Sequence, residues 1–178
     1  MSFALGDLLF AGLLAICALT FALGTRRWPD LWRRLPRERV AGVMLATACL
    51  AWSAYLALPM LEGGLMKLRP VIKLLVPVTA VLAYLHLSFL FTRAFGGALV
   101  LATTWLLHAA FVVNLPARPA FALACYAIAL VGMTLIAAPW LFRELLKHAA
   151  ESKPWRLGAS LGCALACLFF AAFAVLAQ

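Results

Sequence analysis

Acidic residues are scarce in this sequence, and polar residues of every kind are few. The chain has six Asp and Glu against fifteen Lys and Arg, and charged residues make up 12% of its 178 positions, about half the share in an ordinary soluble domain. Hydrophobic residues account for 67%, and the mean hydropathy is +1.05. This composition excludes a soluble globular protein and predicts a single polytopic membrane domain over residues 1–178.

Motifs of hydrolytic and metal-dependent enzymes are also lacking. The sequence has no HExxH, no GxSG, no paired aspartates and no Asp-rich metal motif. All five cysteines lie inside apolar runs, which argues against a disulfide framework. Cys163 and Cys167 have i, i+4 spacing, whereas metal sites usually use Cys-x-x-Cys. We therefore expect no metal and no other cofactor, and an enzyme is disfavoured.

What the sequence does contain is six long apolar runs separated by short breaks. A run of about 20 apolar residues crosses the bilayer as a helix, because a helix satisfies its own backbone hydrogen bonds where water is absent. No basic segment precedes the first run, so we expect an uncleaved first span instead of a signal peptide. The fold class is an all-α integral membrane protein, a bundle of about six transmembrane helices. The predicted spans are about 3–24, 39–59, 74–92, 95–114, 119–142 and 157–177.

Basic residues are distributed unequally between two sets of breaks. The breaks after the first, third and fifth spans hold eleven of the fifteen Lys and Arg, and the other breaks hold four. Because basic loops stay in the cytoplasm, we predict an N-out/C-out topology in the inner (cytoplasmic) membrane. The same rule explains the net charge of +9, so we do not expect nucleic acid as a partner.

The first basic break has a pattern of its own. Trp28, Leu31, Trp32 and Leu35 share one helical face, and arginines occupy the others. This pattern predicts a short cytoplasmic interfacial helix with its guanidinium groups on anionic lipid headgroups. A topology anchor without lipid specificity explains the same residues. The predicted lipid-interface anchor residues are Arg26, Arg27, Trp28, Trp32, Arg33 and Arg34.

The break between the second and third spans mixes basic and bulky apolar residues on the predicted outer side. We expect residues 60–73 either to lie on the interface or to dip into the membrane. Asp7 lies at the same level and is the one carboxylate within a predicted span. An outer-face polar cluster that binds an anionic ligand is one interpretation, and a connector with snorkelling lysines is the other. The candidate cluster comprises Asp7, Glu62, Lys67, Arg69, Lys73, Asn114 and Arg118.

Two histidines lie inside neighbouring predicted spans, where ionisable groups are costly and are candidates for function. His86 and His108 differ in predicted depth by roughly 10 Å. Haem ligands must face each other at one level, so haem is not expected. A staggered polar path for protons or solutes fits this spacing, and hydrogen bonds to a neighbouring helix are the structural alternative. The candidate path comprises His86, His108, Tyr84, Ser88 and Thr104.

Three functions are compatible with these patterns. The sparse intramembrane charge favours a non-catalytic accessory or structural subunit that packs with a partner membrane protein or a second copy of the chain. The Gly158-x3-Gly162 spacing fits such close helix packing. A small-solute or proton-linked transporter or channel using the His86/His108 hairpin is the first alternative. A membrane enzyme that modifies lipid headgroups is the second. Membrane lipids with anionic headgroups are expected partners in all three cases.

Overall fold

The structure is a computed structural model that describes residues 3–24, 39–57, 69–86, 90–113 and 117–176. Side chains are described throughout these ranges except at 24, 39, 69, 72–73 and 83–86. Nearly all the described residues are helical and none is in a strand, which confirms the predicted all-α class. The elements are α1 (Phe3–Leu19), its π-helical continuation η1 (Thr20–Gly24), α4 (Arg39–Ala57), α5 (Arg69–His86), α6 (Leu90–Val112), α7 (Arg118–Ala137), α8 (Pro139–Glu151) and α9 (Lys153–Leu176).

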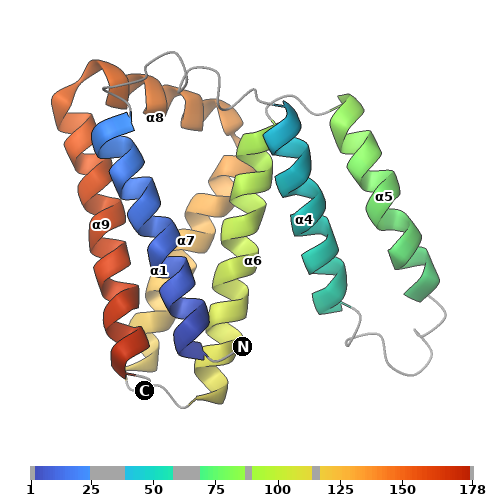
Figure 1. Ribbon diagram of the computed structural model, residues 1–178, viewed down its shortest axis with the longest axis horizontal. Coiled ribbons are helices and arrows are strands. Elements are labelled where there is room, and N and C mark those ends of the chain that lie inside the picture. Colours follow the sequence, from blue (N-terminus) through green and yellow to red (C-terminus); the bar gives the residue numbers. More distant parts are fainter. Residues whose placement is uncertain (1–2, 25–38, 58–68, 87–89, 114–116, 177–178) are drawn as a thin grey trace.

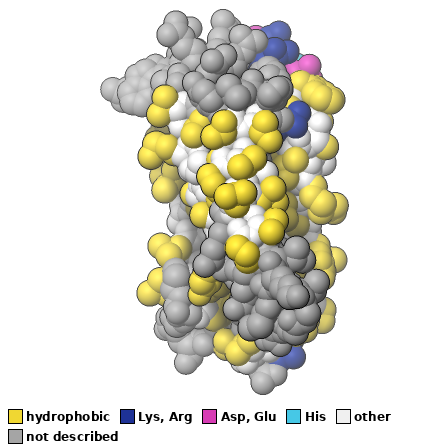
Figure 2. All heavy atoms as spheres, turned by 90° about the vertical axis from the view of Figure 1, so that its right-hand side faces the viewer, with side chains coloured by type: hydrophobic (Ala, Val, Ile, Leu, Met, Phe, Trp, Pro, Cys, Tyr) yellow, Lys and Arg dark blue, Asp and Glu magenta, His cyan; other side chains and the backbone are white. Residues whose placement is uncertain are grey.

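The molecule is a multi-pass membrane protein. Five helical segments among the described residues are long and apolar enough to cross a membrane, and they include α1, α4, α6, α7 and α9. Helix α5, which corresponds to the predicted third span, is not one of the five. In Figure 2, hydrophobic side chains cover the middle of the α5 side, and the described charged side chains lie toward its two ends.

Helix α6 is the centre of the arrangement. It contacts α1, α4, α7 and α8, and α1 packs along α9 to complete a bundle of α1, α6, α7 and α9. Helix α4 packs against α6 outside this bundle, and α5 follows on the far side of α4 (Figure 1). Helix α8 lies crosswise over one end of the bundle, and both chain termini lie at the opposite end (Figure 1).

Glycines allow three helices to approach α6 closely. A Cβ atom built on Gly96 of α6 would lie 2.5 Å from the carbonyl oxygen of Gly132 on α7. A Cβ built on Gly42 of α4 would lie 2.8 Å from the backbone nitrogen of Phe91 on α6. On α1, a Cβ at Gly6 would overlap the indole ring of Trp105. Close backbone approach of this kind is how membrane helices gain packing energy, since lipid supplies no hydrophobic driving force between helices.

Interlocking phenyl rings join α1, α7 and α9. Phe121 of α7 is fully buried, and its ring centroid lies 5.7 Å from that of Phe3, 5.4 Å from Phe170 and 5.3 Å from Phe173. Phe10 of α1 meets Phe170 edge to face at 5.1 Å. Such pairs add to the energy of burial itself, so this cluster holds the half of the bundle farthest from α8.

Two predicted helix boundaries are wrong. In one case an apolar run conceals a break between helices, and in the other a charged residue suggested a break at the wrong place. The predicted span 119–142 ends at Ala137, and Pro139 begins α8 instead of bending a continuous span. Proline lacks the N–H needed to continue α7 but suits the first turn of a new helix. Conversely, Arg93 was expected in the break between the predicted spans 74–92 and 95–114, yet it lies in the first turn of α6 beside the fully buried Thr92.

The predicted packing of the third and fourth spans is also wrong. The short connection suggested a hairpin of α5 on α6, but α4 lies between them (Figure 1). Close contact at Gly42 and a hydrogen bond donated by the Cys49 thiol to the Ala94 carbonyl oxygen, 3.6 Å away, bring α4 against α6. The predicted interfacial helix at residues 28–35 lies outside the described residues.

Neighbouring glycines of α6 provide a direct test of this packing. Gly96→Ala should lower the free energy of unfolding by about 1–3 kcal/mol, because the new methyl group meets the α7 backbone. Gly97→Ala is the matched control, since a Cβ there has nothing within 4 Å, and it should be neutral or stabilising by up to about 1 kcal/mol. Denaturant unfolding in detergent micelles measures both. Equal stabilities of the two variants would contradict the observed α6–α7 contact.

Candidate functional site: a lateral groove between α1, α4 and α6

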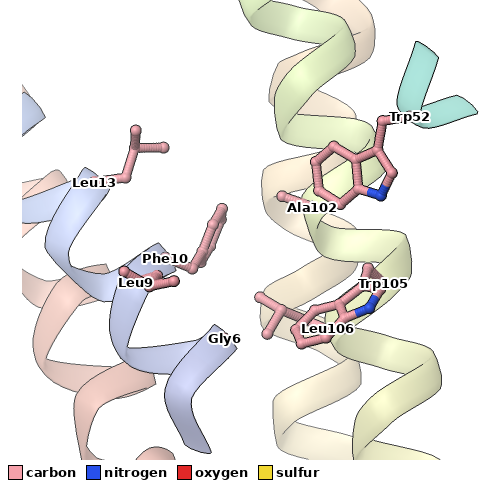
Figure 3. Close-up of a pocket in the computed structure, with 8 residues that line it drawn as sticks. All are labelled: Gly6, Leu9, Phe10, Leu13, Trp52, Ala102, Trp105 and Leu106. Atoms are coloured by element: carbon pink, nitrogen blue, oxygen red, sulfur yellow. The ribbon is translucent and has the colours of Figure 1, made fainter. Parts of the chain in front are cut away.

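A groove of about 400 Å³ lies between α1 and α4, with α6 as its floor. Figure 3 shows α1 on one side, the α6 residues on the other and Trp52 entering from α4. The lining is mainly apolar. The groove, called the lateral groove below, is lined by Gly6, Leu9, Phe10, Leu13, Trp52, Ala102, Trp105 and Leu106.

Small and large residues alternate across the lateral groove and determine its shape. The missing side chain at Gly6 makes room for the Trp105 ring, which rises from α6 toward α1. Ala102, one turn earlier on α6, leaves a depression beside Trp105 and below Trp52. On the α1 wall, Leu9 and Leu13 remain exposed, so the groove is open along that edge.

The threonine hydroxyl groups of α6 near the lateral groove offer it no free hydrogen-bond donor. Thr103 donates to the Leu99 carbonyl oxygen at 2.9 Å, and Thr104 donates to that of Val100 at 2.8 Å. Both bonds stay within α6, as is common for threonine in membrane helices. The lateral groove therefore presents mainly apolar surface.

Asp7 lies behind the groove, on the inner face of α1. Its side chain is fully buried, and neither carboxyl oxygen has a hydrogen-bond partner in the part of the chain that the structure describes. Phe3 and Phe10, about one turn away on either side, belong to the phenyl cluster. The carboxyl is near enough to the Cys125 thiol of α7 to interact with it electrostatically. A buried polar group without a partner costs stability, which makes Asp7 a candidate for function.

The structure separates the histidines of the predicted polar path. His86 is the last residue of α5, next to the end where α6 begins at Leu90, whereas His108 follows Leu90 by eighteen residues, or about 27 Å along α6. The side chains of Tyr84 and His86, and all of Ser88, lie outside the description. His108 and Thr104 are exposed on the outer surface of α6, one turn apart. Participation of these residues in a path stays a prediction.

The predicted outer-face cluster is only partly described. Asp7 lies inside the bundle instead of on a surface, and Arg118 is half-buried at the start of α7. Arg69 and Lys73 are described by their backbone in α5, and Glu62, Lys67 and Asn114 lie outside the described residues. The predicted anchor residues Arg26, Arg27, Trp28, Trp32, Arg33 and Arg34 lie outside them as well.

Sequence reasoning missed the lateral groove, although a signal for it was present. Trp52 and Trp105 lie inside α4 and α6, whereas tryptophan usually marks the ends of spans at the membrane interface. Only the packing of α1 and α4 on α6 brings these two side chains to one surface. Among the described residues, no group of three or more His, Cys, Asp or Glu is placed to hold a metal ion.

Comparison with known proteins supplies no relative. No model of a protein family, no curated protein and no solved structure matches this chain.

The burial of Asp7 predicts a stability change. Asp7→Leu should raise the free energy of unfolding by about 1–3 kcal/mol, because it removes an unpartnered polar group from the apolar bundle. Asp7→Ala removes the same carboxyl group without adding side-chain volume. Denaturant unfolding in detergent measures both variants. A clear decrease in both would show that the carboxyl has a bonding partner in the folded protein.

Proposed function

We propose that this protein is a non-catalytic accessory subunit of a membrane-protein complex, and that the lateral groove receives a transmembrane helix of the partner. One observation carries the proposal, namely an apolar groove that opens sideways between two membrane helices and has one tryptophan on a wall and one on its floor. Membrane helices associate through close packing against small residues, and Ala102 provides such a residue at the groove. Buried tryptophans are frequent anchors of protein interfaces.

A polar side chain beside the groove favours a protein occupant over a lipid tail. His108 is exposed on α6 and follows Trp105 by three residues, so the two are neighbours on the helix surface. An imidazole facing hydrocarbon has no hydrogen-bond partner, whereas a partner helix can supply one. Lipid tails offer only apolar surface.

The outer helices extend the proposed docking face. Helix α5 lies beyond α4 at the edge of the molecule (Figure 1). Val40, Met44 and Tyr55 of α4 are at least 69% exposed. We propose that α4 and α5 lie along the partner as an arm beside the groove.

The finer topology is part of the same proposal. We infer that α5 is a sixth membrane span, that the α8 end faces the cytoplasm, and that the membrane is the inner one. The described helices support this orientation through their basic residues, since Arg143, Lys147, Lys153 and Arg156 lie in α8 or the start of α9. A basic interfacial helix at residues 28–35 would belong to the same face.

Site-specific photo-crosslinking tests the docking proposal. A benzophenone side chain in place of Leu13, on the groove wall, should give one polypeptide adduct of defined mass in native membranes. The same probe in place of Leu168, which is 67% exposed on α9, is the control and should not give that adduct. Adducts with lipid alone, or the same adducts from both positions, would overturn the proposal.

Tryptophan substitutions provide a second test of the groove. Trp52→Ala should weaken the complex by about 2 kcal/mol or more, roughly thirtyfold, if this residue is an interface anchor. Trp140→Ala, at a 53% exposed residue of α8, should leave association unchanged. Quantitative co-purification in mild detergent compares them. Equal recovery of the partner with both variants would argue against docking in the lateral groove.

Proton-linked transport is a second candidate, favoured by the buried carboxyl of Asp7, which has no hydrogen-bond partner among the described residues. Protein reconstituted into vesicles would then dissipate an imposed pH gradient, and Asp7→Asn would stop this flux without lowering the melting temperature. Tyr126→Phe, at a 58% exposed position on α7, is the control and should retain the flux. Absence of flux in the unsubstituted protein, or its persistence in Asp7→Asn, would rule this candidate out.

A further inference from the structure

The junction of α8 and α9 forms an elbow with a defined shape. Helix α8 ends at Glu151 and α9 begins at Lys153. The Ser152 backbone N–H donates to the His148 carbonyl oxygen at 2.8 Å, and the Arg156 N–H donates to the Ser152 carbonyl oxygen at 3.2 Å. These bonds continue from one helix into the next, so the elbow is held by the backbone itself.

A second groove, separate from the lateral groove, lies at this elbow. It encloses about 390 Å³ and is lined by Leu145, Pro154, Trp155, Gly158 and Ala159. The indole of Trp155 stacks on the imidazole of His148, with ring centroids 5.8 Å apart and 27° between the planes. This stacking positions a 57% exposed tryptophan at the groove.

The elbow groove continues onto the surface of α9. Trp155, Gly158 and Gly162 follow one another at spacings of three and four residues, so they share one face of the helix. A Cβ built on either glycine has nothing within 4 Å. The groove thus leads from the end of the bundle along an open, smooth strip of a membrane-spanning helix.

Cations cluster at the elbow end of this strip. Lys153 and Arg156 flank Pro154 and Trp155 in the first turn of α9, and Lys147 lies about one turn before the end of α8, whereas Arg143 lies farther back on α8, away from the elbow. The acidic residues of this region are Glu144 and Glu151. No ion pair forms among these six side chains, all of which are described. The positive charge at the elbow is therefore available to an anionic ligand.

We propose that the elbow binds an anionic phospholipid, with an acyl chain along the Trp155–Gly158–Gly162 strip and the phosphate at Lys153 and Arg156. The combination of an apolar strip with cations identifies the occupant. The strip is apolar along the membrane helix, and the cations lie only at the elbow end of the strip. Basic pockets beside membrane helices bind anionic headgroups in this way, and tryptophan lies at the headgroup level. This site is independent of the proposed partner helix in the lateral groove.

Lipid titration of the full-length protein in detergent tests the site, with thermal stabilisation and native mass spectrometry as readouts. Phosphatidylglycerol should bind and stabilise, and phosphatidylcholine with the same acyl chains should do so far more weakly. Lys153→Gln and Arg156→Gln should each weaken phosphatidylglycerol binding about fivefold. Arg143→Gln is the matched control, because Arg143 lies about 12 Å from the end of α8, and it should leave binding unchanged.

A steric variant tests the acyl-chain strip separately from the charges. Gly158→Leu fills open space, so it should keep the fold and reduce lipid binding at least tenfold. Gly97→Leu places the same side chain at another glycine with open surroundings and should not affect binding. Equal binding of the two lipids, or unchanged binding by Gly158→Leu, would overturn the proposal. Complete competition by inorganic phosphate would also overturn it, since a soluble anion would then account for the cations.

Discussion

Close backbone approach to α6 is the constraint on which the rest of the arrangement depends. Lipid and leucine are equally apolar, so membrane helices associate through tight packing at small residues. Here Gly42 on α4 and the Gly96–Gly132 pair between α6 and α7 bring backbones together, and Gly6 on α1 accommodates Trp105. Three helices thus pack on α6. Helix α7 leads into α8 and α9, and the phenyl rings of α7 and α9 pack against each other and against α1.

The two proposed binding surfaces are consequences of this arrangement. The lateral groove exists because α1 and α4 both contact α6 without closing over Trp105 between them. The elbow groove exists because Pro139 ends α7, and the crosswise α8 must then turn at Ser152 to enter the membrane as α9. One surface is apolar and lies within the membrane span, and the other ends in cations that form no ion pair with the described acidic residues of α8. This difference in chemistry is why we assign a protein helix to the first and an anionic lipid to the second.

Much of the fold could be predicted from composition and run length, but boundaries and neighbours could not. Five predicted spans correspond to helices apolar enough to cross the membrane. The fifth span was predicted too long because Pro139, Trp140 and Phe142 continue an apolar run, and only the burial of Phe142 and Leu146 shows that α8 is a separate amphipathic helix. For the candidate site, sequence reasoning selected Asp7 but placed it on a surface. It did not select Trp52 or Trp105.

The sequence by itself determined the class of this protein, because backbone hydrogen bonds cannot be left unsatisfied in hydrocarbon and long apolar runs must therefore form membrane helices. Only the tertiary structure decided which helices are neighbours. Apolar periodicity is weak when every face of a helix is apolar, so the sequence does not indicate that α4 separates α5 from α6. The choice of neighbours depends on where a missing Cβ permits close contact between helices. It brings Trp52 and Trp105 to one groove and leaves His86 and His108 far apart.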